Sequence, residues 1–298
     1  MPDDMKNKVM SAHSNVALFS STPSEDEVVD LELALLLEAI LFRYGYDFRH
    51  YAQASLTRRV RNCVQKAGLS RISELIPKVL YDVDCFELFL REMSVTVTEM
   101  FRDPEVFEVL RDKIISQLKT YSRINIWHAG CATGEEVYSL AILLKEEGLL
   151  SRCQIYATDF NNESLSIAEQ GIYHADKMAQ YTKNYLSSGG KASFSDYYQA
   201  KHGYAIMHED LKQNITFAHH NLIKDQCFAQ MHLIVCRNVL IYFDRSLQDS
   251  VLGLFNQSLL YRGYLLLGNK ESLEFNAQKD NFTAIAKAQC LFQKVNYD

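Results

Sequence analysis

The sequence predicts an all-helical N-terminal unit followed by an α/β domain with a parallel, doubly wound sheet. Two observations predict this. Residues 26–95 show only helical apolar patterns, and beyond Tyr121 short apolar strands alternate with helices. The chain has 298 residues, of which 48% are hydrophobic and 23% charged, so its composition is that of an ordinary globular protein of one large or two modest domains.

The helical unit is expected to follow a flexible leader at 1–25, which is rich in Ser and has little apolar periodicity. Its first helix is expected over 27–44, with Gly45 as the residue that ends it. Three more helices are predicted, at 50–67, 71–81 and 84–93.

A linker is expected at 96–120. Within it, Asp103 before Pro104 is typical of a helix N-cap with proline at the first helical position, so a helix is predicted from there to about 119.

The α/β domain is expected over 121–298. Strands are predicted near 124–127, 154–158, 215–217, 233–236 and 264–267, with helices near 135–147, 162–170 and 245–260. The stretch 180–214 breaks this alternation and is rich in Tyr, Ser and Gly, so we expect a small inserted β element there.

Charge and cysteine usage exclude several classes of protein. The net charge is −6 and the pI is near 5.9, which argues against a general nucleic-acid binder but allows a local basic patch. The seven cysteines form no CxxC pair, so neither a disulfide framework nor a structural zinc site is expected. No apolar run is long enough to span a membrane and no secretion signal is visible, so the sequence indicates a cytoplasmic protein.

The turn after the first strand, residues 128–136, is the prime candidate for a ligand site, because ligands of α/β sheets bind at the carboxyl ends of strands. It lacks the glycines of a dinucleotide fingerprint and the Gly-Lys-Ser/Thr of a P-loop. A cationic ligand without phosphate, such as S-adenosylmethionine, fits better. Glu135 could attract its amine, and Asp159 could accept hydrogen bonds from its ribose hydroxyls.

Several strings then occur in order: Phe101-Arg102-Asp103, Thr133-Gly134-Glu135-Glu136, Ala157-Thr158-Asp159 and Cys236-Arg237-Asn238-Val239-Leu240-Ile241-Tyr242-Phe243. Together with Gly45-Tyr46-Asp47-Phe48 and Leu56-Thr57-Arg58-Arg59-Val60, they resemble the CheR-type chemoreceptor glutamate methyltransferases over roughly residues 28–275.

The resemblance implies a helical domain joined to a Rossmann-like S-adenosylmethionine-dependent methyltransferase domain with a small β subdomain. It also implies esterification of receptor glutamates, with S-adenosylhomocysteine as the second product. The residues that it places around the cofactor are Thr96, Thr98, Arg102, Gly130, Glu135, Asp159, Asn221, Leu222, Arg237 and Asn238. It places Arg102 and Tyr242 close to the transferred methyl group. The turn at 199–203 is shorter than in members that bind a receptor tail peptide, so tethering by such a tail is not favoured.

Methyl transfer from a sulfonium to a carboxylate needs no general base, because the carboxylate is already ionised at neutral pH. It needs alignment and the removal of water, and no metal is expected. Arg102 could orient the substrate carboxylate through a charged hydrogen bond, and Tyr242 could donate to it or line the methyl channel.

A basic stretch between Arg43 and Arg71 contrasts with the overall negative charge. We interpret Arg58, Arg59 and Arg61 as a docking surface for the acidic helical bundle of a methyl-accepting receptor or a related signalling protein. The alternative is a solvated helix face.

Two other functions stay open at this stage. One is methylation of a small molecule or an exocyclic base nitrogen, although Arg237-Asn238-Val239-Leu240 stands where base methyltransferases usually carry an Asn/Asp-Pro-Pro-aromatic string. The other is a non-catalytic module that senses the cofactor or acts as a scaffold.

Overall fold

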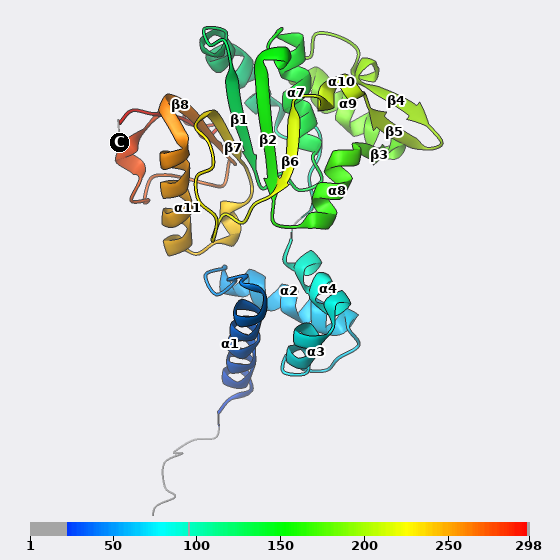
Figure 1. Cartoon of the computed structure of the whole chain (residues 1–298), viewed down its shortest axis with the longest axis vertical. Coiled ribbons are helices and arrows are strands. Elements are labelled where there is room, and N and C mark those ends of the chain that lie inside the picture. The colour runs from blue at the N-terminus through cyan, green and yellow to red at the C-terminus, as the bar shows by residue number, and fades with distance from the viewer. Residues whose placement is uncertain (1–22, 95, 297–298) are drawn as a thin grey trace, which may run out of the picture.

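The computed structural model describes residues 23–94 and 96–296, and it has a small helical domain beside a larger α/β domain (Figure 1). The helices of the small domain are α1 (Glu25–Tyr44), α2 (Gln53–Lys66), α3 (Leu75–Tyr81) and α4 (Val83–Met93). Residues 1–22 of the expected leader lie outside the described residues, and α1 begins within its last residues.

Local sequence signals set the ends of α1. The hydroxyl of Ser24 accepts from the Glu27 backbone N–H, and the Glu27 carboxylate accepts from the Ser24 backbone N–H, which is a complete capping box. At the other end Gly45 has a φ of 74°, a conformation that costs glycine little, so its predicted role as the C-cap is confirmed.

The core of the small domain comes from one face of each helix. In α2 the buried side chains are Leu56, Val60, Cys63 and Val64, spaced as one stripe of a helix. Of the other side chains of α2, some are exposed and some face the large domain. The arginines of α2 are divided between these two groups.

The linker contains α5 (Pro104–Val109), a π-helical turn (Leu110–Ile114) and α6 (Ile115–Leu118). Asp103 is the N-cap residue of α5 and Pro104 stands at its start, as predicted, but the Asp103 side chain makes no capping hydrogen bond. Its φ is 55°, and its carboxylate pairs with Arg237 of the large domain instead.

Within the described residues, seven strands of the large domain form one mixed sheet in the order β6-β2-β1-β7-β8-β10-β9. The strands are β1 (Ile124–Ala129), β2 (Cys153–Asp159), β6 (Ile215–His219), β7 (Met231–Cys236), β8 (Leu259–Leu267), β9 (Phe282–Ala286) and β10 (Leu291–Lys294). The first five are parallel, but β10 runs antiparallel to both β8 and β9. The expectation of a wholly parallel sheet is therefore wrong at this edge.

The main helices of this domain are α7 (Glu135–Glu146), α8 (Asn162–Gln170), α9 (Met178–Ser187), α10 (Glu209–Lys212) and α11 (Arg245–Ser258). Short 3₁₀ turns lie at Leu150–Arg152, Ala175–Lys177, Phe194–Tyr197, Leu240–Tyr242 and Lys279–Asn281.

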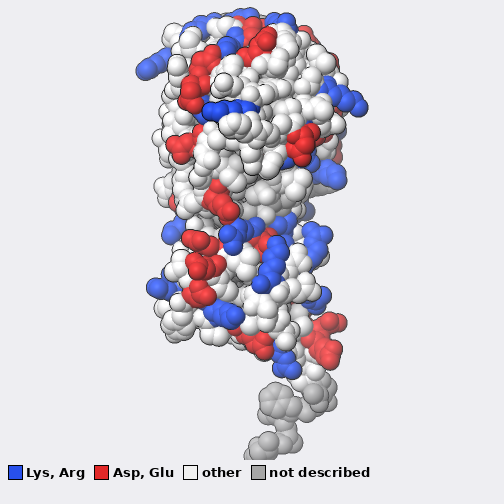
Figure 2. All heavy atoms as spheres, turned by 90° about the vertical axis from the view of Figure 1, so that its right-hand side faces the viewer, with Lys and Arg blue, Asp and Glu red and all other residues white. Residues whose placement is uncertain are grey.

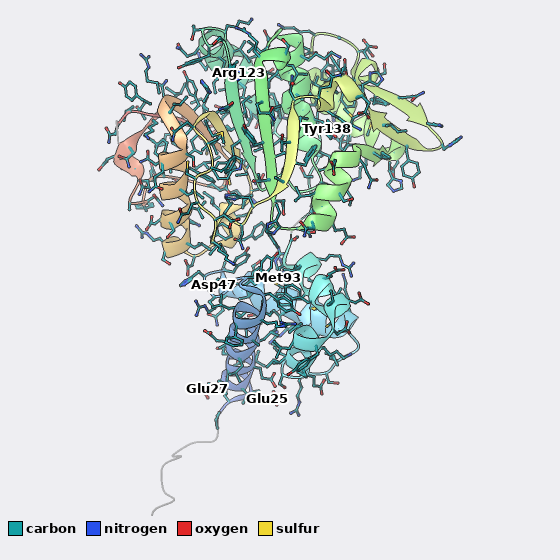
Figure 3. All side chains as sticks on the ribbon, in the orientation of Figure 1. Glu25, Glu27, Asp47, Met93, Arg123 and Tyr138 are labelled. Carbon is teal, nitrogen blue, oxygen red and sulfur yellow. The ribbon has the colours of Figure 1, made fainter. Side chains whose placement is uncertain are left out.

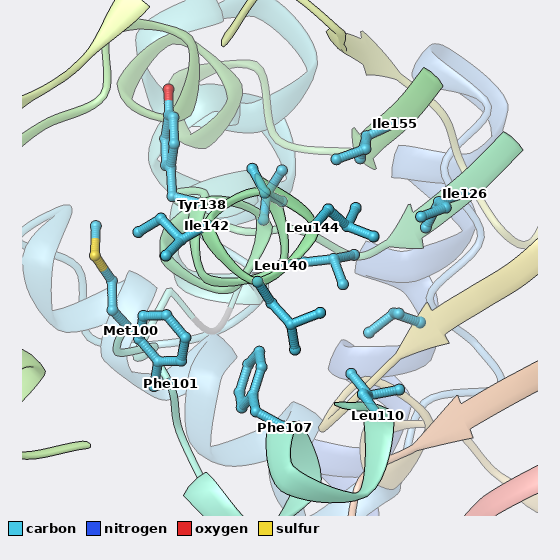
Figure 4. Packing of buried hydrophobic residues seen from close by; sticks show 14 of the residues in the cluster. Met100, Phe101, Phe107, Leu110, Ile126, Tyr138, Leu140, Ile142, Leu144 and Ile155 are labelled. Carbon is cyan, nitrogen blue, oxygen red and sulfur yellow. The ribbon is translucent and has the colours of Figure 1, made fainter. Parts of the chain in front are cut away.

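Apolar cores cover both faces of the sheet. Figure 4 shows one of them, where Leu140 and Leu144 of α7 lie near Ile126 of β1 and Ile155 of β2. Phe101 of the linker belongs to the same core and is fully buried, so the chain next to Arg102 is fixed by packing.

A separate sheet, in the order β3-β5-β4, is formed by β3 (Ile172–His174), β4 (Tyr198–Lys201) and β5 (Tyr204–Met207). Part of the stretch expected to be an inserted β element is thus helix α9, and the sheet begins earlier, at β3. In the described part of the chain, no helix combines the length and apolarity needed to cross a membrane.

Candidate functional site

A cavity of about 220 Å³ lies at the carboxyl ends of β1, β2 and β7, where the small domain meets the large one. This is where the doubly wound arrangement predicts a ligand site. Its lining includes these residues singled out from the sequence: Thr96, Thr98, Arg102, Gly130, Asp159, Asn221, Leu222, Arg237, Asn238 and Tyr242.

Gly130 is the glycine of the first turn and packs against Val239. Its φ is 73°, and a Cβ atom there would lie 2.5 Å from Cγ2 of Val239. Its N–H donates to the Thr158 carbonyl at 2.8 Å, which holds the turn against the end of β2. Only glycine meets both the backbone and the packing requirement, so Gly130 allows the first turn and Val239 to pack together at the cavity.

Asp159 is the acid at the end of β2, and its carboxylate is buried and fixed. It accepts from the backbone N–H of Ala132 at 2.9 Å and from that of Asn161 at 3.0 Å. Burial raises the pKa of Asp159, and these hydrogen bonds act in the opposite direction. A carboxylate held in this way has lone pairs left to accept hydrogen bonds from hydroxyl groups in the cavity.

The two adjacent glutamates at the start of α7 have different surroundings. Glu135 is buried and is not among the residues that line the cavity, so its contact with the ligand stays a prediction. It accepts from the Thr133 hydroxyl at 2.6 Å and lies 3.9 Å from Lys177 Nζ. Glu136 lines the cavity instead, because successive residues of a helix point about 100° apart.

Glu136 belongs to a buried charge network. Arg237 donates to the carboxylates of Glu136 and Asp103, and also to the Arg102 carbonyl at 3.2 Å. Burial would raise the pKa of Glu136, but the Arg237 guanidinium and His128 together outweigh it and hold this pKa well below its ordinary value. The Arg237 Nε is buried and has no hydrogen-bond partner among the described residues.

Arg102 differs from Arg237 because no described residue pairs with its guanidinium. It lies at the cavity between Phe101 and Asp103, which both have a positive φ, of 54° and 55°. Such backbone is costly for residues other than glycine, and it persists because its surroundings hold it. The Phe101 N–H donates to Ser139 Oγ at 2.8 Å and Asp103 pairs with Arg237, so Arg102 extends from a rigid bend.

Tyr242 ends the 3₁₀ turn at Leu240–Tyr242 and lines the same cavity. The guanidinium carbon of Arg59 lies 5.0 Å from the centroid of its ring. This is cation–π distance, and the cation comes from α2 of the small domain.

The asparagines and Leu222 line the cavity in different ways. The Asn221 side chain accepts from the Ile223 N–H at 3.0 Å, so it shapes its own loop as well as lining the cavity. Asn238 has a φ of 61°, and its N–H donates to Glu271 at 3.2 Å. Leu222 packs on the core behind the sheet.

The three arginines predicted to form a docking surface do not all have the same exposure. Arg58 and Arg61 are exposed, but Arg59 is half-buried and faces the large domain. Arg59 therefore lies on a different face of α2 from Arg58 and Arg61, and its part in a partner surface stays a prediction. On the face in Figure 2, basic side chains gather near the junction of the two domains, with acidic ones beside them.

Sequence reasoning missed several lining residues: Tyr51, Ser94, His128, Glu136, Phe160 and His220. Phe160 follows Asp159, and Glu136 is the second acid of the glycine turn, so their neighbours could have identified them. Tyr51 and Ser94 come from the small domain, and no local pattern shows that this domain closes over the sheet.

These residues fit the ligand expected from the sequence. The glycine turn at Gly130 and the acceptor Asp159, both at the cavity, suit a cofactor with hydroxyls and no phosphate, such as S-adenosylmethionine. Among the described residues, no group of His, Cys, Asp or Glu is arranged to hold a metal ion.

Comparison with known proteins agrees with this geometry. The family model of the CheR methyltransferase SAM-binding domain matches residues 96–290, and that of the CheR all-alpha domain matches 31–94. The Cher3 protein of Pseudomonas putida is 48% identical over 89% of this chain and 97% of its own length. Chemotaxis protein methyltransferase 1 of Vibrio cholerae is 33% identical over 72% of this chain and 79% of its own. Both domains, the order of their motifs and the cavity between them show that the chain belongs to the CheR methyltransferase family.

Proposed function

We propose that this methyltransferase esterifies glutamate side chains of a chemoreceptor-type signalling protein, using S-adenosylmethionine and releasing S-adenosylhomocysteine. The observation that carries the proposal is Arg102, which lies at the cavity, forms no ion pair with any described residue and is fixed by a rigid bend of the chain. A neutral substrate would gain little from such a cation, whereas a carboxylate gains a charged hydrogen bond.

When bound, the cofactor supplies a methyl group on a positively charged sulfur. One oxygen of the substrate carboxylate forms a bond to the methyl carbon as the carbon–sulfur bond breaks, and the electron pair of that bond stays on sulfur. No proton moves, so the protein needs no general base. Its task is to align the carboxylate and exclude water.

In this proposal Arg102 holds the carboxylate oxygen that does not react, and Tyr242 lines the path of the methyl group and donates to the same carboxylate. Arg102 supplies one orienting contact, because a tight pair with both oxygens would lower their nucleophilicity. The rigid backbone beside Arg102 supports this role, since alignment accounts for most of the rate gain.

The cofactor would lie along the carboxyl ends of β1 and β2. Asp159 would accept hydrogen bonds from its ribose hydroxyls, and Gly130 would let it approach the backbone. The other proposed contacts are Thr96, Thr98, Asn221, Leu222, Arg237 and Asn238, which line the same cavity.

The test is a methyl-labelling assay on receptors from the same cell. A methyl ester releases its label as methanol in mild base, whereas N-methyl groups and ethers keep theirs. We expect base-labile label with the wild-type protein and its loss with Arg102→Ala, while calorimetry shows that the variant still binds the cofactor. Cofactor binding without base-labile label in the wild type would contradict the proposal and favour a non-catalytic module.

A further inference from the structure

We infer that Arg59 is a positioning residue that holds the ring of Tyr242 from the small domain and does not bind the partner. This inference rests on the proposed function, since it gives a role to a neighbour of Tyr242. The inference gives Arg59 a different role from its neighbours. Arg59 acts within the molecule, whereas Arg58 and Arg61 are exposed.

The contacts of Arg59 fix its guanidinium in one place. Nε donates to the Ser55 hydroxyl at 3.2 Å, and Nη1 donates to the Glu92 carbonyl at 3.0 Å. Nη1 also lies 3.5 Å from the carbonyl oxygens of Met93 and Ser94. A cation suits this position, because the last carbonyls of α4 carry the negative end of the helix dipole.

These contacts join two walls of the cavity. Met93 and Ser94 line it from the small domain, and Tyr242 lines it from the large domain. Arg59 binds the carbonyl oxygens of the first wall and lies over the aromatic ring of the second. Among the described residues the Tyr242 hydroxyl has no hydrogen-bond partner, so Arg59 provides the specific contact that orients this side chain.

The backbone around Tyr242 is held by the same domain. The Ala52 N–H donates to the Tyr242 carbonyl at 2.8 Å, and the Asp244 N–H donates to the His50 carbonyl at 2.7 Å. Between them, Tyr51 pairs with Phe243 as an antiparallel bridge. The small domain therefore holds the main chain around Tyr242 through residues 50–52, and it holds the Tyr242 ring through Arg59. In this way Arg59 can affect the reaction without contacting the substrate.

The test compares Arg59→Met, which keeps length without charge, with Arg59→Lys, which keeps a cation for the ring. For Arg59→Met we expect kcat to fall roughly tenfold, the scale of one cation–π contact. KM for the receptor and the affinity for the cofactor should stay within about twofold of wild type, because Arg59 touches neither. Arg59→Lys should restore most of kcat. A rise in KM at unchanged kcat would overturn the inference and return Arg59 to the docking surface.

A double-mutant cycle separates positioning from general destabilisation. If Arg59 acts through Tyr242, Arg59→Met should have no further effect on kcat in a Tyr242→Leu background. An equal loss in both backgrounds would contradict the inference. Rates are counted per cofactor-binding site, so that unfolded protein does not lower them.

A readout without activity separates this inference from the proposed function. In protein labelled with fluorotyrosine, the resonance missing from Tyr242→Phe belongs to Tyr242. It should shift in Arg59→Met and stay in place in Arg58→Met. An unshifted resonance would overturn the inference even if the methylation assay succeeds. A shifted resonance with no ester formed by the wild type would leave the contact established and contradict only the proposed function.

Discussion

Arg102 shows how much a single residue depends on its neighbours along the chain. Its type and place in the Phe-Arg-Asp string could be identified from the sequence. The positive φ of Phe101 and Asp103 could not, since neither is glycine or asparagine and their cost is offset by burial and by Arg237. Likewise Glu135 was singled out from the sequence, but Glu136 lines the cavity, and this depends on how α7 is oriented on the sheet.

Gly130→Ala tests whether the first turn contacts the cofactor. The new Cβ would meet Val239 at 2.5 Å and the residue would be forced to a φ of 73°. We expect affinity for S-adenosylmethionine, measured by calorimetry, to fall at least about tenfold, which is about 1.4 kcal/mol.

Gly148→Ala is the matched control. Its φ is 70° and nothing lies within 4 Å of the added Cβ, so it carries the same backbone cost without the clash. It should lower the free energy of unfolding by about 1–2 kcal/mol and leave cofactor affinity unchanged. Equal affinities for the two variants would mean that the turn at Gly130 does not contact the cofactor.

At the scale of elements, the Glu136–Arg237 pair joins the start of α7 to the end of β7, and Asp103 extends it to the linker. Glu136→Gln would remove one of the two described carboxylates that pair with the buried Arg237 guanidinium, leaving only Asp103. We expect it to lower the free energy of unfolding at pH 7 by about 3–5 kcal/mol, measured by denaturation in urea.

The pH dependence of this difference follows from the lowered pKa of Glu136. A lowered pKa stabilises the fold above the unfolded value of about 4.3, and that contribution is lost as the pH falls below it. The gap between wild type and Glu136→Gln should therefore shrink below about pH 4. Burial raises the pKa of Glu135, so Glu135→Gln should have an effect of opposite sign at pH 7. A gap that does not change with pH would contradict the assigned pair.

The limits of sequence reasoning at this scale have physical causes. Strands with helices between them could be located because each buries its own apolar run. β9 and β10 were missed because Phe282–Ala286 and Leu291–Lys294 are short: β10 is held by its pairing with β8 and β9, and β9, at the edge of the sheet, by its pairing with β10. The sequence also could not predict which face of α2 carries Arg59, because this depends on how the small domain packs on Tyr242.

For the whole molecule, the positions of the charges indicate more about its binding partner than the net charge of −6 does. The exposed pair Arg58 and Arg61 is on the small domain, and we propose that it docks an acidic helical partner. The double variant Arg58→Glu and Arg61→Glu should raise KM for the receptor at least about fivefold at low salt and leave cofactor affinity unchanged.

Arg123→Glu is the control for a single reversal, because Arg123 is exposed at the far end of the large domain, away from Met93 and Asp47 at the junction (Figure 3). It should change KM much less than Arg58→Glu alone. Equal effects of the two single reversals would indicate attraction by overall charge and would contradict docking on α2.

The central claim is that a carboxylate oxygen receives the methyl group under the control of Arg102. Mapping the methyl group on a receptor by peptide mass spectrometry tests it most directly. We predict a glutamate side chain heavier by one methylene group, restored to its original mass by mild base, with a rate of formation that falls about 10²-fold in Arg102→Ala. A methyl group that survives base, or an Arg102→Ala protein as fast as wild type, would contradict the account.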